Sequence, residues 1–357
     1  MRVKELVLGA ARAAGAFALV RNSAWRSRRL MILCYHGVSM DDEHEWSPTL
    51  YITPKRLRER LQALRDGGYA ILPLVEAVRR LYDGTLPPRS VALTFDDGAV
   101  DFELQALPIL REFNAPATLY LTTYYSTKRL PVFNTILGYV LWKGRRSNAD
   151  VAPLIGASEP LNIGSDAARA KSRTALWEYA DRLAMSADEK DAFVARVAEH
   201  IGVDYPAIKA RGTLAIMSPE AVRALPRDLI DVQLHTHRHR TPRNRELFLR
   251  EIRDNDVIIR ELRPDGPALE HFCYPSGDYH GEFFDWLREC DVRYATTCLP
   301  DLATADTEPM LLPRFVDTMV ASSLIFESWI SGFAALLPRK QEFRVDARRL
   351  AATGSGG

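Results

Sequence analysis

The segment Val91-Ala-Leu-Thr-Phe-Asp-Asp-Gly98 joins a short apolar run to two adjacent carboxylates and a glycine. Such a run, rich in strand-forming residues, predicts a buried strand that ends before Gly98. Asp96 and Asp97 then lie where the strand meets a loop, at the edge of the sheet where α/β folds bind ligands. Because adjacent carboxylates repel and are costly to bury, we expect a cation or a retained proton beside them. A plain turn, with one aspartate capping the next helix, would also fit.

Short apolar segments of this kind recur along the chain and alternate with helical patterns. Residues 54–67 and 102–113, for example, carry leucines at helical spacing. This alternation is typical of α/β proteins with a parallel sheet or barrel. About seven strands that feed helices are predicted, in the segments 30–35, 91–95, 117–121, 231–235, 271–274, 293–297 and 311–316, with a further brief strand at 69–72.

Residues 127–213 interrupt the alternation with helical patterns such as 175–183 and 188–201. A stretch this long and this regular predicts a helical insertion or lid rather than a linker. It leaves the sheet after the strand at 117–121, next to the strand that carries Asp96 and Asp97. The insertion could therefore cover a cleft and select the substrate, or form an outer layer that only adds stability.

The composition is that of a globular protein. Of 357 residues, 47% are hydrophobic and 26% are charged, and the formal net charge of +1 gives no reason to expect a nucleic-acid partner. The four cysteines form no metal or disulfide pattern, so we expect reduced thiols and a cytoplasmic location. No apolar run approaches the length of a membrane span, and Arg12 interrupts residues 6–20, so no secretory signal is expected.

The two ends of the chain differ from the middle. Residues 1–29 carry seven basic side chains against Glu5 alone, with apolar residues at near-helical spacing. They predict a basic amphipathic helix that either docks on its own domain or makes peripheral contact with an anionic membrane. Residues 30–338 form the predicted catalytic domain with its insertion, and 339–357 a frayed tail.

Three of the eight histidines fall within five residues, directly after the predicted strand at 231–235. Imidazole is the commonest metal ligand, and the spacing would place His235 and His239 on one face of a helical turn. The alternative is a solvated basic loop, because four arginines surround them: Arg238, Arg240, Arg243 and Arg245.

The aspartate pair and the histidines belong at the same edge of one sheet. Two imidazoles and one carboxylate, with positions left open, suit a catalytic divalent ion. We expect Zn²⁺, with Co²⁺ or Ni²⁺ as alternatives. A closed structural site would more often use four ligands, and the cysteines are not arranged for one.

Three motifs in this order resemble the polysaccharide deacetylase family, also called carbohydrate esterase family four or the nodulation-deacetylase homology domain. They are Thr94-Phe-Asp-Asp-Gly98, His235-Thr-x-x-His239 and Phe272-Cys-Tyr-Pro-Ser-Gly277. The resemblance spans about residues 30–320 and does not explain the insertion. An early Tyr35-His36 and the Tyr-Pro-x-Gly motif are similar to a subgroup that includes exported poly-N-acetylglucosamine deacetylases.

The resemblance implies a distorted (β/α) barrel of about seven parallel strands and hydrolysis of an N-acetyl group on a sugar. By motif position it also implies that Asp96 is the general base. Asp97, His235 and His239 would be the metal ligands, and the backbone N–H of Ser276 would help to hold the oxyanion.

Two positions depart from the family pattern. Cys273 stands where many members have an arginine that holds the base, and the late Leu-x-His motif that supplies the acid is absent. Arg314, at the end of a late strand, is predicted to hold Asp96 instead; the alternative is a surface arginine. His36, at the end of the first strand, is predicted to be the acid, with a turn residue or a metal ligand as alternatives.

We therefore expect a metal-dependent hydrolase that deacetylates an N-acetylated polysaccharide, oligosaccharide or lipid-linked sugar. Two other functions stay open at this point. One is a catalytically decayed carbohydrate-binding protein. The other is a different metal-dependent hydrolase, for example of phosphate esters, that uses the arginines around the histidines to hold anions.

Overall fold

The structure, a computed structural model, describes residues 3–128 and 130–338, with the side chains of residues 3 and 4 left out. The tail predicted at 339–357 lies outside the described residues.

The centre of the molecule is a parallel sheet in the order β10-β1-β5-β6-β7-β8-β9, with β4 beside β5. A parallel bridge between Thr296 and Leu312, which precedes β10, joins the two ends of this order, so the sheet curls into a barrel. The fold expected from the sequence, a distorted (β/α) barrel of about seven parallel strands, is confirmed. Its strands are β1 (Met31–Tyr35), β4 (Ala70–Ile71), β5 (Ser90–Phe95), β6 (Ala117–Leu121), β7 (Ile230–Leu234), β8 (His271–Cys273), β9 (Tyr294–Thr296) and β10 (Phe315–Val316).

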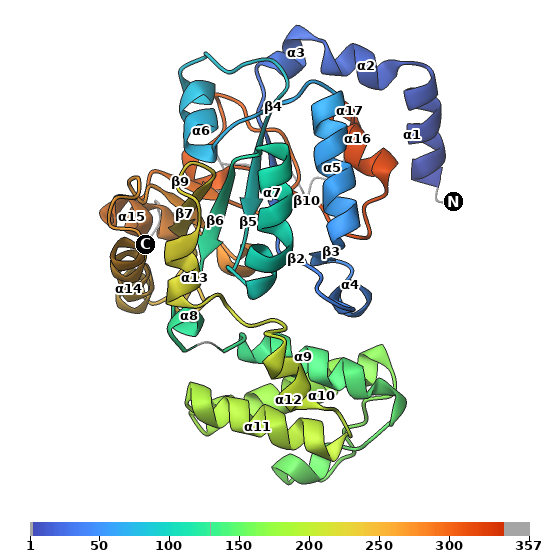
Figure 1. Cartoon of the computed structure of the whole chain (residues 1–357), viewed down its shortest axis with the longest axis vertical. Coiled ribbons are helices and arrows are strands. Elements are labelled where there is room, and N and C mark those ends of the chain that lie inside the picture. The colour runs from blue at the N-terminus through green and yellow to red at the C-terminus, as the bar shows by residue number, and fades with distance from the viewer. Residues whose placement is uncertain (1–2, 129, 339–357) are drawn as a thin grey trace.

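Alternate residues of each strand point to opposite sides of the barrel wall. Leu33 and Leu93 belong to the large apolar cluster between sheet and helices, whereas Ile32 and Ala92 belong to a smaller one with Tyr120. Helices on the outside cover the first cluster (Figure 1). They are α5 (Pro54–Asp66), α7 (Leu107–Phe113), α13 (Pro219–Ala224), α14 (Arg245–Leu262), α15 (Glu282–Glu289), α16 (Ser323–Ile330) and α17 (Phe333–Leu336), whereas α6 (Leu74–Tyr82) packs on the smaller cluster.

Several helix starts follow from capping residues. Thr53 caps α5, with Pro54 at its first position, and Ser218 caps α13 in the same way. The helix predicted at 102–113 begins instead as a π-helix, Phe102–Ala106, before α7. Pro108 has no N–H to donate to the preceding turn, which favours this wider start.

The N-terminal region differs from the single helix predicted for residues 1–29. It forms α1 (Val3–Ala13), α2 (Ala16–Arg21) and α3 (Ala24–Ser27). Gly15 lies between α1 and α2 at a φ of 77°, a conformation that breaks a helix and that glycine adopts easily. Leu8 and Phe17 are buried, and the Phe17 ring lies 5.0 Å from that of Phe333 in α17.

These helices therefore dock on their own domain. Leu6 and Val7 of α1 face outward, so contact with a membrane stays a prediction. None of the helices within residues 3–128 and 130–338 is both long and apolar enough to cross a membrane.

The insertion forms a helical lobe below the barrel (Figure 1). Its helices share a hydrophobic cluster of their own, which includes Leu137, Leu176 and Val197. Two antiparallel bridges, Pro131 to Ala215 and Ala99 to Ile216, tie the start and end of the lobe to the loop after β5. The helices of this region are α8 (Tyr124–Lys128), α9 (Phe133–Lys143), α10 (Asp166–Arg182), α11 (Ala187–His200) and α12 (Tyr205–Ala210).

A further short segment lies between β1 and α5 and reaches the lobe. It contains β2 (Gly37–Val38), paired with β3 (Tyr51–Ile52), and between them α4 (Glu43–Trp46). The Trp46 ring lies 5.4 Å from that of Tyr139 in α9. The carboxyl ends of β1 and β5 therefore face a space between the barrel and the insertion lobe.

Candidate active site

Asp96 and Arg314 form a buried, two-pronged ion pair, so the contact predicted from the sequence is present. Arg314 Nη1 lies 2.7 Å from Asp96 Oδ1, and Nη2 lies 2.8 Å from Oδ2. The guanidinium also donates to Thr94 Oγ1 and to the carbonyl oxygen of Thr297, both at 3.0 Å. Burial alone would raise the pKa of Asp96, but the charge and hydrogen bonds of Arg314 outweigh it and hold that pKa well below its usual range.

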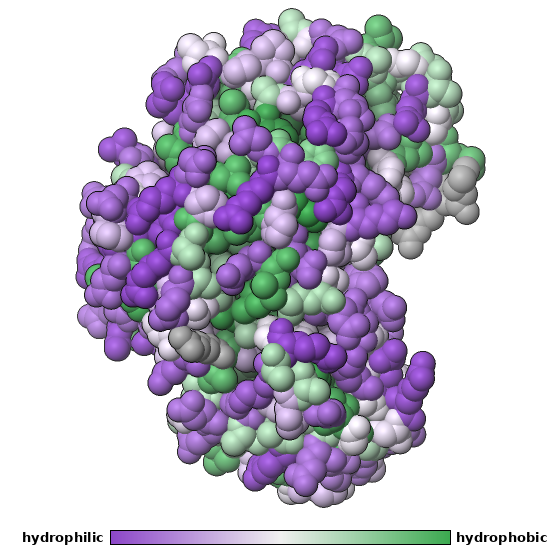
Figure 2. All heavy atoms as spheres, in the orientation of Figure 1, coloured by the Kyte–Doolittle hydropathy of each residue, from purple (hydrophilic) through white to green (hydrophobic). Residues whose placement is uncertain are grey.

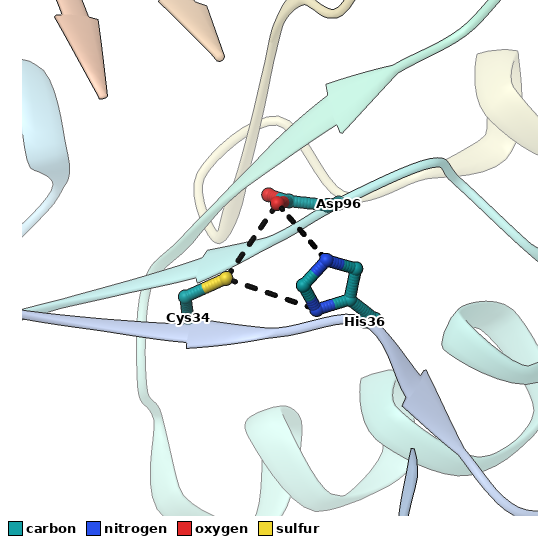
Figure 3. A group of neighbouring side chains, drawn as sticks. All are labelled: Cys34, His36 and Asp96. Carbon is teal, nitrogen blue, oxygen red and sulfur yellow. Dashed lines mark hydrogen bonds and ion pairs between the residues drawn. The ribbon is translucent and has the colours of Figure 1, made fainter. Parts of the chain in front are cut away.

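Two thiols and one imidazole also lie against this carboxylate, all at Oδ2. Cys34 and Cys273 donate to Asp96 Oδ2 at 3.5 and 3.4 Å. His36 Nε2 lies 3.6 Å from the same oxygen, and His36 Nδ1 lies 3.9 Å from Cys34 Sγ. Figure 3 shows Cys34, His36 and Asp96 as a closed triangle between the ends of β1 and β5. The imidazole thus bridges the predicted base and a thiol.

Asp97 turns away from its neighbour and meets two histidines. Its Oδ1 lies 3.1 Å from His235 Nε2 and 3.1 Å from His239 Nε2. Asp97 has a φ of 70°, and Gly98 follows at 82°, so two left-handed residues reverse the chain and separate the two carboxylates. A Cβ at position 98 would lie 2.4 Å from Leu121 Cδ1, so a larger residue would displace that side chain, and the positive φ of this position favours glycine.

The two histidines are not on a helical turn, as their spacing predicted. Residues 235–239 form an irregular loop after β7, in which Thr236 and His239 have positive φ angles of 61° and 54°. These two reversals bring the imidazoles together, with ring centroids 5.0 Å apart. The i, i+4 spacing is therefore correct for the pair, but the backbone conformation inferred from it was wrong.

Further contacts orient these side chains for a cation. His235 Nδ1–H donates to the carbonyl oxygen of Cys273 at 2.9 Å, which orients the ring so that Nε2 faces Asp97. Such a second hydrogen bond is typical of metal-binding histidines. Burial would raise the pKa of Asp97, but His239 and His235 outweigh it and keep the carboxylate ionised.

Asp97, His235 and His239 each offer one ligand atom, and these atoms lie within 4.8 Å of one another. One anionic oxygen and two imidazole nitrogens can hold a divalent metal ion. The donor set therefore fits the metal expected from the sequence. His36 is not part of this group and lies instead with Cys34 and Asp96.

A cleft of about 810 Å³ connects this centre to the insertion lobe. Figure 2 shows an indentation in the outline of the molecule between the barrel and that lobe. Arg314 lies behind Asp96, away from the cleft and fully buried. Ser276 reaches the cleft from the turn after β8, where its φ is 58°. The other predicted site residues that line the cleft are His36, Asp96, Asp97, His235 and His239.

Two residues of α14 that the sequence analysis missed hold the histidine loop. Asn255 accepts the backbone N–H of His235 at 2.9 Å and donates to the carbonyl oxygen of Leu121 at 3.0 Å. Glu251 is buried and accepts the backbone N–H of Arg238 at 2.7 Å. Both are polar residues four apart within the apolar stripe of an amphipathic helix. That mismatch is the sequence signal that could have identified them.

The arginines around the histidines have carboxylate partners rather than an open anion site. Arg238 and Arg240 contact Glu251 at 3.2 and 2.8 Å. Arg243 pairs with Glu282, and Arg245 with Glu289. The middle histidine of the cluster, His237, is buried against Thr123, with 2.8 Å between its Nδ1 and Thr123 Oγ1.

Comparisons with known proteins agree with this arrangement. Residues 83–141 match the family model described as polysaccharide deacetylase. Over 102 residues the chain is 30% identical to the poly-beta-1,6-N-acetyl-D-glucosamine N-deacetylase of Escherichia coli (strain K12). That match covers 28% of this chain and 15% of the Escherichia coli protein, so the chain spans only a small part of its relative's length.

Two solved structures are similar over most of the chain. The Streptococcus pyogenes deacetylase PplD, solved in complex with acetate, has a TM-score of 0.55 and 18% identity, and the alignment covers 85% of this chain and 98% of that one. IcaB from Ammonifex degensii has a TM-score of 0.52 and 16% identity, with 85% and 97% of the two chains covered. At these identities the likeness shows a shared fold.

Proposed function

We propose that this chain, a member of the polysaccharide deacetylase family by its matched segment and its fold, hydrolyses the N-acetyl group of an N-acetylated saccharide with a bound divalent metal ion. The observation that carries the proposal is the pairing of two carboxylate centres in one cleft. Asp97 with His235 and His239 forms a group that can hold a metal, and Asp96 with Arg314 forms a fixed proton acceptor beside it.

The metal group supplies the electrophile. A divalent ion held by Asp97, His235 and His239 would polarise the amide carbonyl and lower the pKa of water. The mixture of imidazole and carboxylate donors favours Zn²⁺, with Co²⁺ or Ni²⁺ as alternatives. Elemental analysis of the purified protein identifies the ion.

Asp96 is the proposed general base. Arg314 keeps it ionised and fixes the plane of its carboxylate, so it can accept a proton from the attacking water. The same pairing lowers its basicity, so orientation is the main contribution that we assign to it. The backbone N–H of Ser276, in the turn after β8, is proposed to help hold the developing oxyanion.

His36 is the proposed proton donor to the leaving amine. It lines the cleft, its side chain is 20% exposed, and its Nε2 is 3.6 Å from Asp96 Oδ2. A proton taken up by Asp96 can therefore pass to His36 and then to the nitrogen as the C–N bond breaks. Acetate and the free amine leave, and both side chains return to their starting states.

The cleft supports a substrate longer than one sugar. Its far wall belongs to the insertion lobe, where Trp177 of α10 is 42% exposed, and Trp46 of α4 lies on the near side. Aromatic faces of this kind stack on sugar rings. The Escherichia coli relative is named for a polymer of N-acetylglucosamine, which agrees with an oligomeric or polymeric substrate.

Trp177→Ala tests the role of the insertion lobe. We expect KM for N-acetylglucosamine oligomers to rise about fivefold, because one stacked aromatic contributes roughly 1 kcal/mol. Metal content should not change. Leu183→Ala is the matched control, since Leu183 is also exposed but lies outside the cleft. Equal effects of the two substitutions would favour an insertion that only adds stability.

The central experiment measures acetate release from N-acetylglucosamine oligomers. We expect release that stops with a chelator and returns when Zn²⁺ is added back. Binding of the oligomer without any release of acetate would support a decayed carbohydrate-binding protein instead. Hydrolysis of phosphate esters but not of acetamides would support the other alternative, although the arginines near the site are paired with carboxylates.

A further inference from the structure

Three of the four cysteines gather at the candidate active site from distant parts of the sequence. Cys34 and Cys273 are fully buried beside Asp96, whereas Cys298 is partly exposed and lines the cleft. Arg314 Nη2, which holds Asp96, also lies 3.6 Å from Cys298 Sγ. The fourth cysteine, Cys290, is partly exposed at the end of α15 and does not line the cleft.

Cys34 and Cys298 interact with each other, and the two thiols are not equivalent. Cys298 interacts with the side chain of Cys34, and this contact lowers the pKa of Cys298 to about 5, with a further contribution from Arg314 against the effect of burial. Burial raises the pKa of Cys34 well above its usual range. The pair therefore combines a thiol of lowered pKa that is open to the cleft with a buried thiol of raised pKa behind it.

We propose that Cys298 is a modification site for electrophiles and peroxides inside the active-site cleft, and that Cys34 is the thiol that closes a disulfide with it. A thiolate that is accessible, close to a cation and next to a second thiol is the arrangement from which reactive and redox-sensitive cysteines arise. The proposed deacetylase function assigns no role to Cys298.

Alkylation or oxidation of Cys298 needs no reactant other than the added reagent and the two thiols. With iodoacetamide, the Cys298 sulfur attacks the methylene carbon, the C–I bond breaks and iodide leaves. With hydrogen peroxide, the same sulfur takes one oxygen, the O–O bond breaks, and hydroxide leaves and is protonated to water. The Cys34 sulfur then attacks the resulting sulfenic acid, the S–O bond breaks, and a second water leaves, so the two thiols are oxidised by two electrons in total.

Either modification would disturb the residues proposed for catalysis. A group on Cys298 would occupy the cleft beside Arg314. A disulfide would remove the S–H that Cys34 donates to Asp96 Oδ2 and would shift the thiol that lies against His36 Nδ1 (Figure 3). This inhibition rests on the proposed function, whereas the reactivity of Cys298 does not.

Labelling with iodoacetamide at pH 6 and pH 8, followed by peptide mass mapping, tests the reactivity. An ordinary thiol reacts about 100-fold more slowly at pH 6, because its thiolate fraction falls with pH. The rate of labelling at Cys298 should change less than threefold between the two pH values. At pH 6 it should exceed the rate at Cys290 by roughly tenfold. This ratio is smaller than the ratio of the two thiolate fractions, because a thiolate of low pKa is intrinsically the weaker nucleophile. A 100-fold fall at Cys298, or faster labelling of Cys290 at pH 6, would overturn the proposal.

Cys34→Ser separates the effect of the Cys34 thiol on Cys298 from the effect of the place of Cys298 in the cleft. The loss of the thiol should restore part of the pH dependence of labelling at Cys298 and abolish the disulfide that peroxide forms in the parent chain. A disulfide between Cys34 and Cys298, reversed by dithiothreitol, supports the proposal. Oxidation of Cys298 in the parent chain without that disulfide would refute the role of Cys34.

Acetate release then reports the consequence. Labelled or oxidised parent protein should lose at least 90% of its activity in proportion to Cys298 occupancy, and Cys298→Ser should keep its own starting activity after the same treatment. Cys290→Ser should remain as sensitive as the parent. Stoichiometric labelling of Cys298 without loss of an existing activity would overturn the inhibitory role. Absence of activity before any treatment would instead argue against the proposed function.

Discussion

Replacing Arg314 by methionine should leave the Asp96 carboxylate buried without the guanidinium that holds it. Arg314 is fully buried, and Asp96 is 2% exposed. Removing one partner of such a pair costs about 3–5 kcal/mol, because the remaining charge is desolvated and unpaired. Since small proteins are stable by only about 5–15 kcal/mol, a loss of this size is easily measured.

The loss should depend on pH in a defined direction. In the parent chain the folded-state pKa of Asp96 is depressed, so this group contributes stability above its unfolded pKa near 3.9 that is lost as the pH falls. In Arg314→Met, burial dominates and raises that pKa. The contribution of Asp96 to the stability of the variant is then present at low pH and is lost as the pH rises. The deficit of the variant should therefore be larger at pH 8 than at pH 5.

Urea unfolding followed by tryptophan fluorescence at both pH values measures the deficit. Arg60→Met is the matched control, because Arg60 forms a similar buried fork with Asp317, at 2.9 and 3.2 Å, outside the cleft. Both variants should lose stability, but only Arg314→Met should lose acetate release per folded molecule. A deficit below about 1 kcal/mol, or one that is the same at pH 5 and pH 8, would refute the reasoning.

Three further substitutions separate the proposed roles. Asp96→Asn should retain the metal and lose roughly two to four decades of kcat, the usual contribution of a general base; loss of metal would mean that the two aspartates have exchanged roles. His239→Ala should fold normally but bind metal far more weakly, and unchanged metal content by elemental analysis would contradict the ligand assignment. His36→Ala should lose a similar two to four decades of kcat with metal intact. Near-normal turnover would remove it as the acid, and loss of metal would make it a ligand.

Much of the site could be predicted because it is built from strand ends. Asp96, His36 and His235 directly follow the apolar runs that form β5, β1 and β7. Parallel strands bring their carboxyl ends to one edge, so residues far apart in sequence can be assigned to one place without coordinates. Arg314 was also expected at a strand end and in contact with Asp96; the contact is present, but Arg314 directly precedes β10 (Phe315–Val316) rather than following a strand.

The backbone of the ligand loops could not be predicted in this way. The spacing of His235 and His239 is equally compatible with a helical turn, and only the left-handed residues Thr236 and His239 show how the loop is built. Those conformations are held by contacts from α14, where Asn255 binds the backbone of His235. A residue with positive φ that is not glycine carries little sequence signal, because its cost is offset by tertiary contacts.

By itself, then, the sequence determined the type of fold, the edge that carries the site and the residues most suited to hold a metal, because periodicity and strand ends are local properties. Only the tertiary structure decided that Cys34, Cys273 and Cys298 gather around the Asp96–Arg314 pair and that Trp177 lines the same cleft. These residues follow no common pattern in the chain. They become neighbours because the barrel closes between β9 and the segment before β10 and because the insertion lobe lines the same cleft.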